Sequence, residues 1–99
     1  MKLGVFRQTP QEKKRFSISY AAWLETGEVV ASIAYAISPV TIPALLIEAS
    51  TVDVGGLGVT FYVSGGVDAT EYQINTLMQT GAGQRKEDYI KVILEDYVV

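Results

Sequence analysis

Two alternating runs near the C-terminal end constrain the fold more than any other feature. In residues 71–80 the side chains of Tyr72, Ile74, Thr76 and Met78 alternate with polar residues, and in residues 86–95 Ile90, Val92 and Leu94 do the same. A period of two is typical of a strand with one buried face. Residues 81–84 (Gly-Ala-Gly-Gln) separate the runs, and glycine accepts the positive φ that tight hairpin turns need. The pattern predicts an antiparallel hairpin.

Four earlier segments also read as strands, at residues 15–20, 28–38, 44–50 and 58–64. The inward residues are expected to be Phe16, Ile18 and Tyr20 in the first, and Val59, Phe61 and Val63 in the last. The register of residues 44–50 stays open because Leu45, Leu46 and Ile47 are apolar on both faces. Six or seven short strands with glycine turns predict an all-β, Ig-like or fibronectin-III-like antiparallel sandwich, with a small barrel as the alternative.

Two aromatic residues have predicted structural roles. Tyr72 opens a long strand directly after a glycine-rich crossing, which favours a tyrosine corner over an ordinary half-buried strand tyrosine. Trp23, the single tryptophan, is expected to close one end of the core, and an exposed binding tryptophan is the alternative.

The domain organisation follows from where the alternation begins. Residues 1–14 are expected to form an N-terminal arm, with a short helical turn after Thr9 because Thr9-Pro10-Gln11-Glu12 resembles a capping box. Residues 1–8 are expected to order only against a partner. Residues 15–99 then form a single β-sandwich domain. The basic triplet at residues 13–15 is interpreted as a solvated turn, with contact to an acidic partner as the alternative.

Composition narrows the chemistry. The 99 residues include no cysteine and no histidine, so disulfides, thiolate metal sites and the commonest catalytic base are excluded. No metal, cofactor or catalytic residue is predicted. The acid pairs Asp68 with Glu71, Glu87 with Asp88, and Glu95 with Asp96 are interpreted as solubilising charge, because nothing in the sequence makes them converge. The protein is therefore expected not to be an enzyme.

Charge and hydropathy limit the partners. A net charge of −3 gives no general footprint for nucleic acid or for a membrane surface. No apolar run reaches the ~20 residues of a membrane-spanning helix, and no secretion signal is seen, so synthesis in the cytoplasm is expected. Apolar residues on the outer face of the last hairpin predict a protein interface. They comprise Leu77, Tyr89 and Ile93, supported by the apolar C-terminal residues Tyr97, Val98 and Val99.

Several blocks together resemble small fiber-tail adaptor proteins of short-tailed phages, over about residues 9–94. The blocks are Lys14-Arg15-Phe16, Trp23-Leu24 with Gly27-Glu28, Gly58-Val59-Thr60-Phe61, Val63-Ser64-Gly65-Gly66, Thr80 to Gln84, and Lys86-Glu87-Asp88. Ser19 departs from the acidic residue common in the family, and Gly81 from its serine; both are compatible with the fold.

The resemblance implies a non-enzymatic virion component, present in several copies, between the head-to-tail connector or tail tube and the tail fibre. A capsid decoration protein and a cellular Ig-like binding module remain alternatives.

Overall fold

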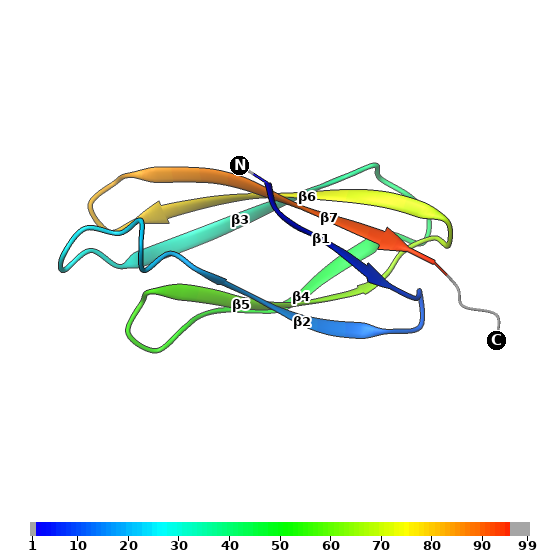
Figure 1. The fold of residues 1–99 in the computed structure, drawn as a ribbon, viewed down its shortest axis with the longest axis horizontal. Helices are drawn as coiled ribbons and strands as arrows, with labels where there is room; N and C mark the ends of the chain where they lie inside the picture. The colour runs from blue at the N-terminus through cyan, green and yellow to red at the C-terminus, as the bar shows by residue number, and fades with distance from the viewer. Residues whose placement is uncertain (1, 96–99) are drawn as a thin grey trace.

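The computed structural model describes residues 2–95, which form two sheets packed face to face (Figure 1). The strands are β1 (Lys2–Gln8), β2 (Lys13–Ser19), β3 (Val30–Ser38), β4 (Leu45–Val52), β5 (Gly58–Gly65), β6 (Thr70–Thr80) and β7 (Arg85–Leu94). One sheet has the order β1-β7-β6-β3 and the other has the order β2-β5-β4. The described residues contain no helix. The predicted all-β sandwich is confirmed, and the two separate sheets rule out the alternative of a closed barrel.

The strand order is that of an immunoglobulin-type sandwich. The second, fourth and fifth strands form one sheet, and the third, sixth and seventh form the other. The predicted hairpin is β6 with β7, paired antiparallel from Thr70 opposite Leu94 to Gln79 opposite Arg85. The first strand joins this second sheet, where it runs parallel to β7.

The core lies between the sheets and is built from the alternating residues. The predicted inward residues of β2, β5, β6 and β7, and Tyr20 directly after β2, are confirmed as buried: Phe16, Ile18, Tyr20, Val59, Phe61, Val63, Tyr72, Ile74, Thr76, Met78, Ile90, Val92 and Leu94. The Phe61 ring joins three strands, because it stacks on Phe16 at 5.8 Å between ring centroids and meets Tyr35 at 4.9 Å. Aromatic contacts of this kind contribute roughly 0.5–1.5 kcal/mol beyond the burial of their area.

Tyr72 forms the predicted tyrosine corner. Its side chain is fully buried, and its hydroxyl accepts a hydrogen bond of 2.9 Å from the backbone N–H of Val67, five residues upstream. The same hydroxyl lies 2.7 Å from the Thr41 hydroxyl in the β3–β4 loop. The corner therefore ties two loops together at one end of the sandwich.

The N-terminal segment differs from the expected arm. Residues 2–8 form strand β1, which pairs with β7 from Tyr89 to Leu94, so this segment is ordered by the chain itself. The expected helical turn after Thr9 is wrong: the chain makes a tight turn and enters β2 at Lys13. The Glu12 carboxylate accepts a bond of 2.7 Å from the Thr9 N–H, as in a capping box. That backbone hydrogen bond lowers the pKa of Glu12.

Strand β4 is irregular in its second half. Its pairing with β5 shifts between Glu48 and Thr51, and Ala49 takes a positive φ of 51°. The residues whose register is open in the sequence precede this bulge, and there the strand alternates: Leu45 is buried, Leu46 is 49% exposed and Ile47 is half-buried.

The molecule is an elongated rod of 48 × 22 × 19 Å. The strand registers place the β1–β2, β3–β4 and β5–β6 connections at one end, called here the corner end. The β2–β3, β4–β5 and β6–β7 connections lie at the other end, called here the Trp end (Figure 1). The two ends of the rod therefore present different sets of loops.

Candidate interaction surfaces

The predicted interface residues of the hairpin share one face but do not form one patch. Leu77 lies opposite Glu87, and its side chain is 40% exposed. Tyr89 and Ile93 are half-buried on the same outer face. Lys91 stands between them and forms an ion pair of 2.9 Å with Glu71. Leu77 and Tyr89 are thus separated from Ile93 by charge.

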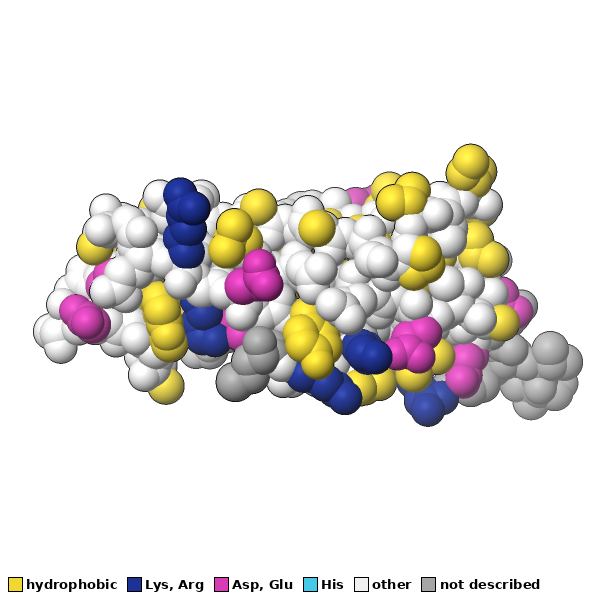
Figure 2. Space-filling model, turned by 90° about the horizontal axis from the view of Figure 1, so that it is seen from above, with side chains coloured by type: hydrophobic (Ala, Val, Ile, Leu, Met, Phe, Trp, Pro, Cys, Tyr) yellow, Lys and Arg dark blue, Asp and Glu magenta, His cyan; other side chains and the backbone are white. Residues whose placement is uncertain are grey.

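A shallow hollow accompanies the Leu77 half of this face. It has a volume of about 260 Å³, and its lining includes Ala34 and Ala36 of β3, Asn75 and Leu77 of β6, and Glu87 of β7. Figure 2 looks onto this sheet and shows hydrophobic side chains in small, separate groups. The other predicted interface residues, Tyr97, Val98 and Val99, lie outside the described residues.

The most exposed apolar side chains lie instead at the two ends of the rod. At the corner end, Val40 and Ile42 of the β3–β4 loop are 89% and 97% exposed. At the Trp end, Val54 is fully exposed in the β4–β5 turn, and Leu57 beside it is 47% exposed. Sequence reasoning missed these residues, although apolar side chains between turn-forming prolines and glycines were a visible signal.

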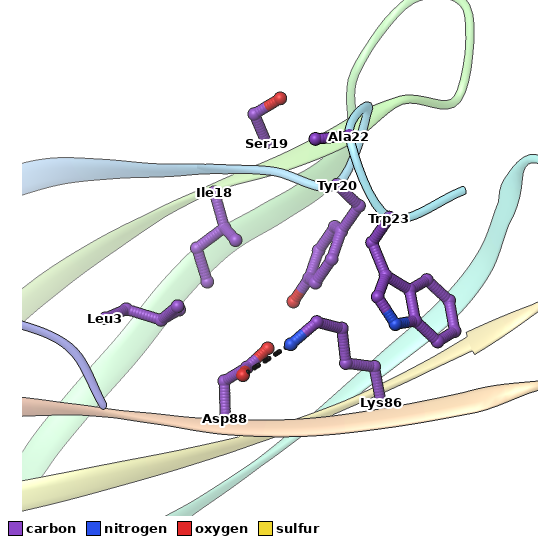
Figure 3. A pocket seen from close by; sticks show the side chains of 8 residues that line it. All are labelled: Leu3, Ile18, Ser19, Tyr20, Ala22, Trp23, Lys86 and Asp88. Atoms are coloured by element: carbon purple, nitrogen blue, oxygen red, sulfur yellow. Dashed lines mark hydrogen bonds and ion pairs between the residues drawn. The ribbon is translucent and has the colours of Figure 1, made fainter. Parts of the chain in front are cut away.

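A cavity of about 340 Å³ opens between the sheets near the Trp end. Figure 3 shows its walls: Leu3 of β1 and Ile18 of β2 on one side, Trp23 on the other, and Lys86 and Asp88 of β7 as the floor. Trp23 is 37% exposed, so the expectation that it closes the end of the core is wrong. The tight turn after Tyr20 leaves the Trp23 indole beside the cavity. Tyr20 and Leu24 pack against the core instead.

The floor of the cavity carries a buried ion pair. The Asp88 side chain is fully buried, and one of its oxygens lies 2.7 Å from the Lys86 ammonium (Figure 3). The interpretation of Asp88 as solubilising charge is therefore wrong. Asp88 is spaced two residues before Ile90, in the same series as Val92 and Leu94. The two-residue alternation could therefore have placed its side chain inside. A carboxylate in this position is stable only with a charged or hydrogen-bonding partner.

The Tyr20 hydroxyl points toward this ion pair (Figure 3). Tyr20 is 2% exposed, and its hydroxyl makes no hydrogen bond of regular geometry within residues 2–95. Burial raises the pKa of Tyr20 to about 12, and the negative charge of Asp88 adds to the effect. The cavity thus combines apolar walls with polar groups at its floor.

Residues 2–95 hold no cluster of three or more acidic, histidine or cysteine side chains arranged to bind a metal ion. Within the same residues no helix is long and apolar enough to cross a membrane.

Fold and surfaces together define an immunoglobulin-like module whose most exposed apolar residues lie on end loops, and exposed apolar groups favour contact with other proteins. A family model described as podophage GP4 fiber-tail adaptor protein gp77 matches residues 8–93. The chain belongs to this family, as the resemblance predicted, and has a structural role in a phage tail, where it contacts other tail components. A search of curated proteins found no match.

Proposed function

We propose that this protein is a non-enzymatic adaptor that links the head-to-tail connector or the tail tube to the tail fibres, in several copies around the tail axis. The observation that carries the proposal is the placement of exposed apolar residues at both ends of the rod. Val40 and Ile42 mark one end and Val54 marks the other, along a molecule 48 Å long. A bridging protein needs two separate contact surfaces, and exposed apolar groups favour protein contact.

The family supports the same conclusion independently. The family is that of podophage fiber-tail adaptor proteins, and the match over residues 8–93 covers nearly the whole sandwich, including both end regions. The adaptor proposal therefore rests on the geometry of the ends and on the family together.

The test is to separate the two ends by mutation. The purified protein is titrated with the tail fibre protein and, separately, with the connector or tail tube of the phage that encodes it. Ile42→Asp and Val54→Asp place a charge on side chains that are almost fully exposed, so neither disturbs the core. Each is expected to weaken binding to one partner at least tenfold and to leave the other unchanged. Ser17→Asp, which adds the same charge on the exposed face of β2, is the control.

Two results would contradict the proposal. One is a wild-type protein that binds only one of the two partners. The other is tight binding of both partners by both end variants. Gold-labelled antibody on purified virions checks the location, because label over the whole capsid instead of the tail vertex indicates a decoration protein.

The outer face of the hairpin stays a proposed contact between copies. The hollow beside Leu77 and the half-buried Tyr89 and Ile93 support it. Ile93→Asp is expected to reduce the number of copies per tail while the folded variant still binds the tail fibre. An unchanged copy number counts against this contact.

A further inference from the structure

The cavity near the Trp end is large enough to receive one aromatic side chain. Its volume of about 340 Å³ exceeds the roughly 150 Å³ in which an apolar protein cavity can hold a benzene ring. Leu3 and Ile18 line one side of it, and the Trp23 indole lines the other (Figure 3). An aromatic ring between these walls buries its apolar surface and packs beside the indole, which is a favourable contact.

The floor of the cavity suits a ring with a polar tip. An ammonium group has three N–H donors, and the Lys86 ammonium donates one of them to the Asp88 carboxylate at 2.7 Å. The Lys86 side chain is 19% exposed, so the floor is not sealed by the core. The buried Tyr20 hydroxyl points to the same place. A phenol oxygen both donates and accepts hydrogen bonds, so a tyrosine side chain matches the apolar walls and the polar floor together.

The chain itself carries a tyrosine among apolar residues at the other end of the rod. Residues 96–99 are Asp-Tyr-Val-Val, and they follow β7 at the corner end, where Leu94 pairs with Thr70. These four residues lie outside the described residues. The other five tyrosines belong to the strands or, in the case of Tyr20, directly follow one. Tyr97 is therefore the tyrosine of this chain that suits the cavity of another copy.

Tyr97 cannot enter the cavity of its own chain. Lys86, at the cavity floor, and Leu94 are eight residues apart on one strand, which corresponds to about 26 Å. Even a fully extended segment 95–99 spans only about 17 Å. A contact between this segment and the cavity therefore joins two copies, with the corner end of one copy against the Trp end of the next.

We propose that the cavity near the Trp end receives the Tyr97 side chain of a second copy of this chain. The proposal rests on the adaptor function proposed above, which has several copies around the tail axis, and names how neighbouring copies are joined. Ile93, proposed above as a contact between copies, lies four residues before Tyr97. Because the contact uses two different surfaces of each copy, it joins copies head to tail and gives a ring where the rotation between them closes.

The test uses this two-sided character of the contact. Ala22→Phe adds a ring at the cavity wall, and because Ala22 is exposed the core stays intact. Tyr97→Ser removes the inserted ring. Sedimentation is expected to show that the wild-type protein associates as its concentration rises, and that each variant alone associates at least tenfold more weakly. An equimolar mixture of the variants is expected to form a dimer and nothing larger, because one variant keeps the cavity and the other keeps Tyr97.

Matched variants and a peptide provide the controls. Ala21→Phe, in the same turn but outside the cavity lining, is expected to associate like the wild type. Tyr97→Phe keeps the ring, so it is expected to lose less affinity than Tyr97→Ser. A synthetic peptide of residues 93–99 is expected to change the Trp23 fluorescence of the Tyr97→Ser protein, since this single tryptophan lines the cavity. The peptide is expected to leave the fluorescence of the Ala22→Phe protein unchanged.

Three results would overturn the inference in distinguishable ways. If both variants associate as tightly as the wild type, the copies meet at another surface. If the wild-type protein stays monomeric and the peptide does not change Trp23 fluorescence, the cavity does not receive this segment. The adaptor function then stands where the protein binds the tail fibre and the connector or tail tube, and fails where it binds neither. If the tail fibre protein alone changes Trp23 fluorescence, and Ala22→Phe abolishes that change, another tail component occupies the cavity.

Discussion

Removal of one hydroxyl tests how the corner end of the rod is held. In the tyrosine corner the Val67 N–H donates to the Tyr72 hydroxyl, 2.9 Å away, and the Thr41 hydroxyl donates to the Pro43 carbonyl, 2.9 Å away. The Tyr72 hydroxyl, 2.7 Å from Thr41 Oγ1, then donates to that oxygen. Tyr72→Phe keeps the buried ring and removes only this link between the loops.

The size of the effect follows from what each group loses. The Val67 N–H is left without its acceptor, and an unsatisfied buried donor costs about 1–3 kcal/mol. Val67 is half-buried, so water recovers part of this cost, and the Thr41 hydroxyl keeps its bond to Pro43. We expect a loss of about 1.5 kcal/mol, which lowers Tm by roughly 6–12 °C in a domain of this size.

Urea unfolding followed by Trp23 fluorescence measures the loss, since Trp23 is the only tryptophan. Tyr62→Phe is the control, because Tyr62 is half-buried and its hydroxyl makes no hydrogen bond within residues 2–95. It is expected to change stability by less than about 0.5 kcal/mol. If Tyr72→Phe and Tyr62→Phe unfold at the same urea concentration as the wild type, the corner does not stabilise the fold and the reasoning fails.

Two further predictions concern the core. A Cβ at Gly66 would overlap the Leu94 side chain at a φ of +90°, so Gly66→Ala is expected to cost about 3 kcal/mol. Gly83→Ala, at φ +91° with open space around it, is expected to cost only about 1–2 kcal/mol, and equal urea midpoints for the two variants would refute the overlap. The second prediction uses pH. With its pKa raised to about 12, Tyr20 keeps its proton in the folded state while the unfolded state loses it near pH 10. Stability from this residue is therefore present below about pH 10 and is lost as pH rises toward 12. Urea midpoints between pH 9 and 11.5 are expected to fall less steeply for Tyr20→Phe, and equal slopes would contradict the assignment.

The fold was predictable where one face of a strand is buried. In β5, β6 and β7 buried and less buried side chains alternate with a period of two. The position of a residue in this alternation is therefore enough to predict whether its side chain is buried. The pattern fails in β1, whose side chains are mostly exposed and whose order depends on pairing with β7 at the other end of the chain. Its buried Gln8 donates from its side-chain amide to the Val63 carbonyl at 3.2 Å, a contact that no local pattern indicates.

The candidate surfaces were less predictable, because they depend on topology. The two-residue alternation correctly placed Leu77, Tyr89 and Ile93 on one face of the sheet. It did not reveal that the ion pair of Lys91 with Glu71 separates Leu77 and Tyr89 from Ile93. All eight Lys and Arg residues lie on β1, β2 and β7, and this grouping is invisible in the sequence, where residues 2–15 and 85–91 lie far apart. It arises only because β1 and β7 are neighbours in one sheet and β2 forms the adjoining edge of the other.

The loops at both ends of the rod are held to the sandwich by hydrogen bonds, which limits their motion before binding. At the corner end, Tyr72 anchors the loop that carries Val40 and Ile42. At the Trp end, the backbone N–H of Tyr20 donates to the Leu57 carbonyl at 2.8 Å, and the Val30 N–H donates to the Gly56 carbonyl at 2.8 Å. Loops held in this way lose little conformational freedom on binding, so more of the contact energy appears as affinity. A rigid rod also fixes the distance between the surfaces at its two ends, which a flexible linker of the same length cannot do.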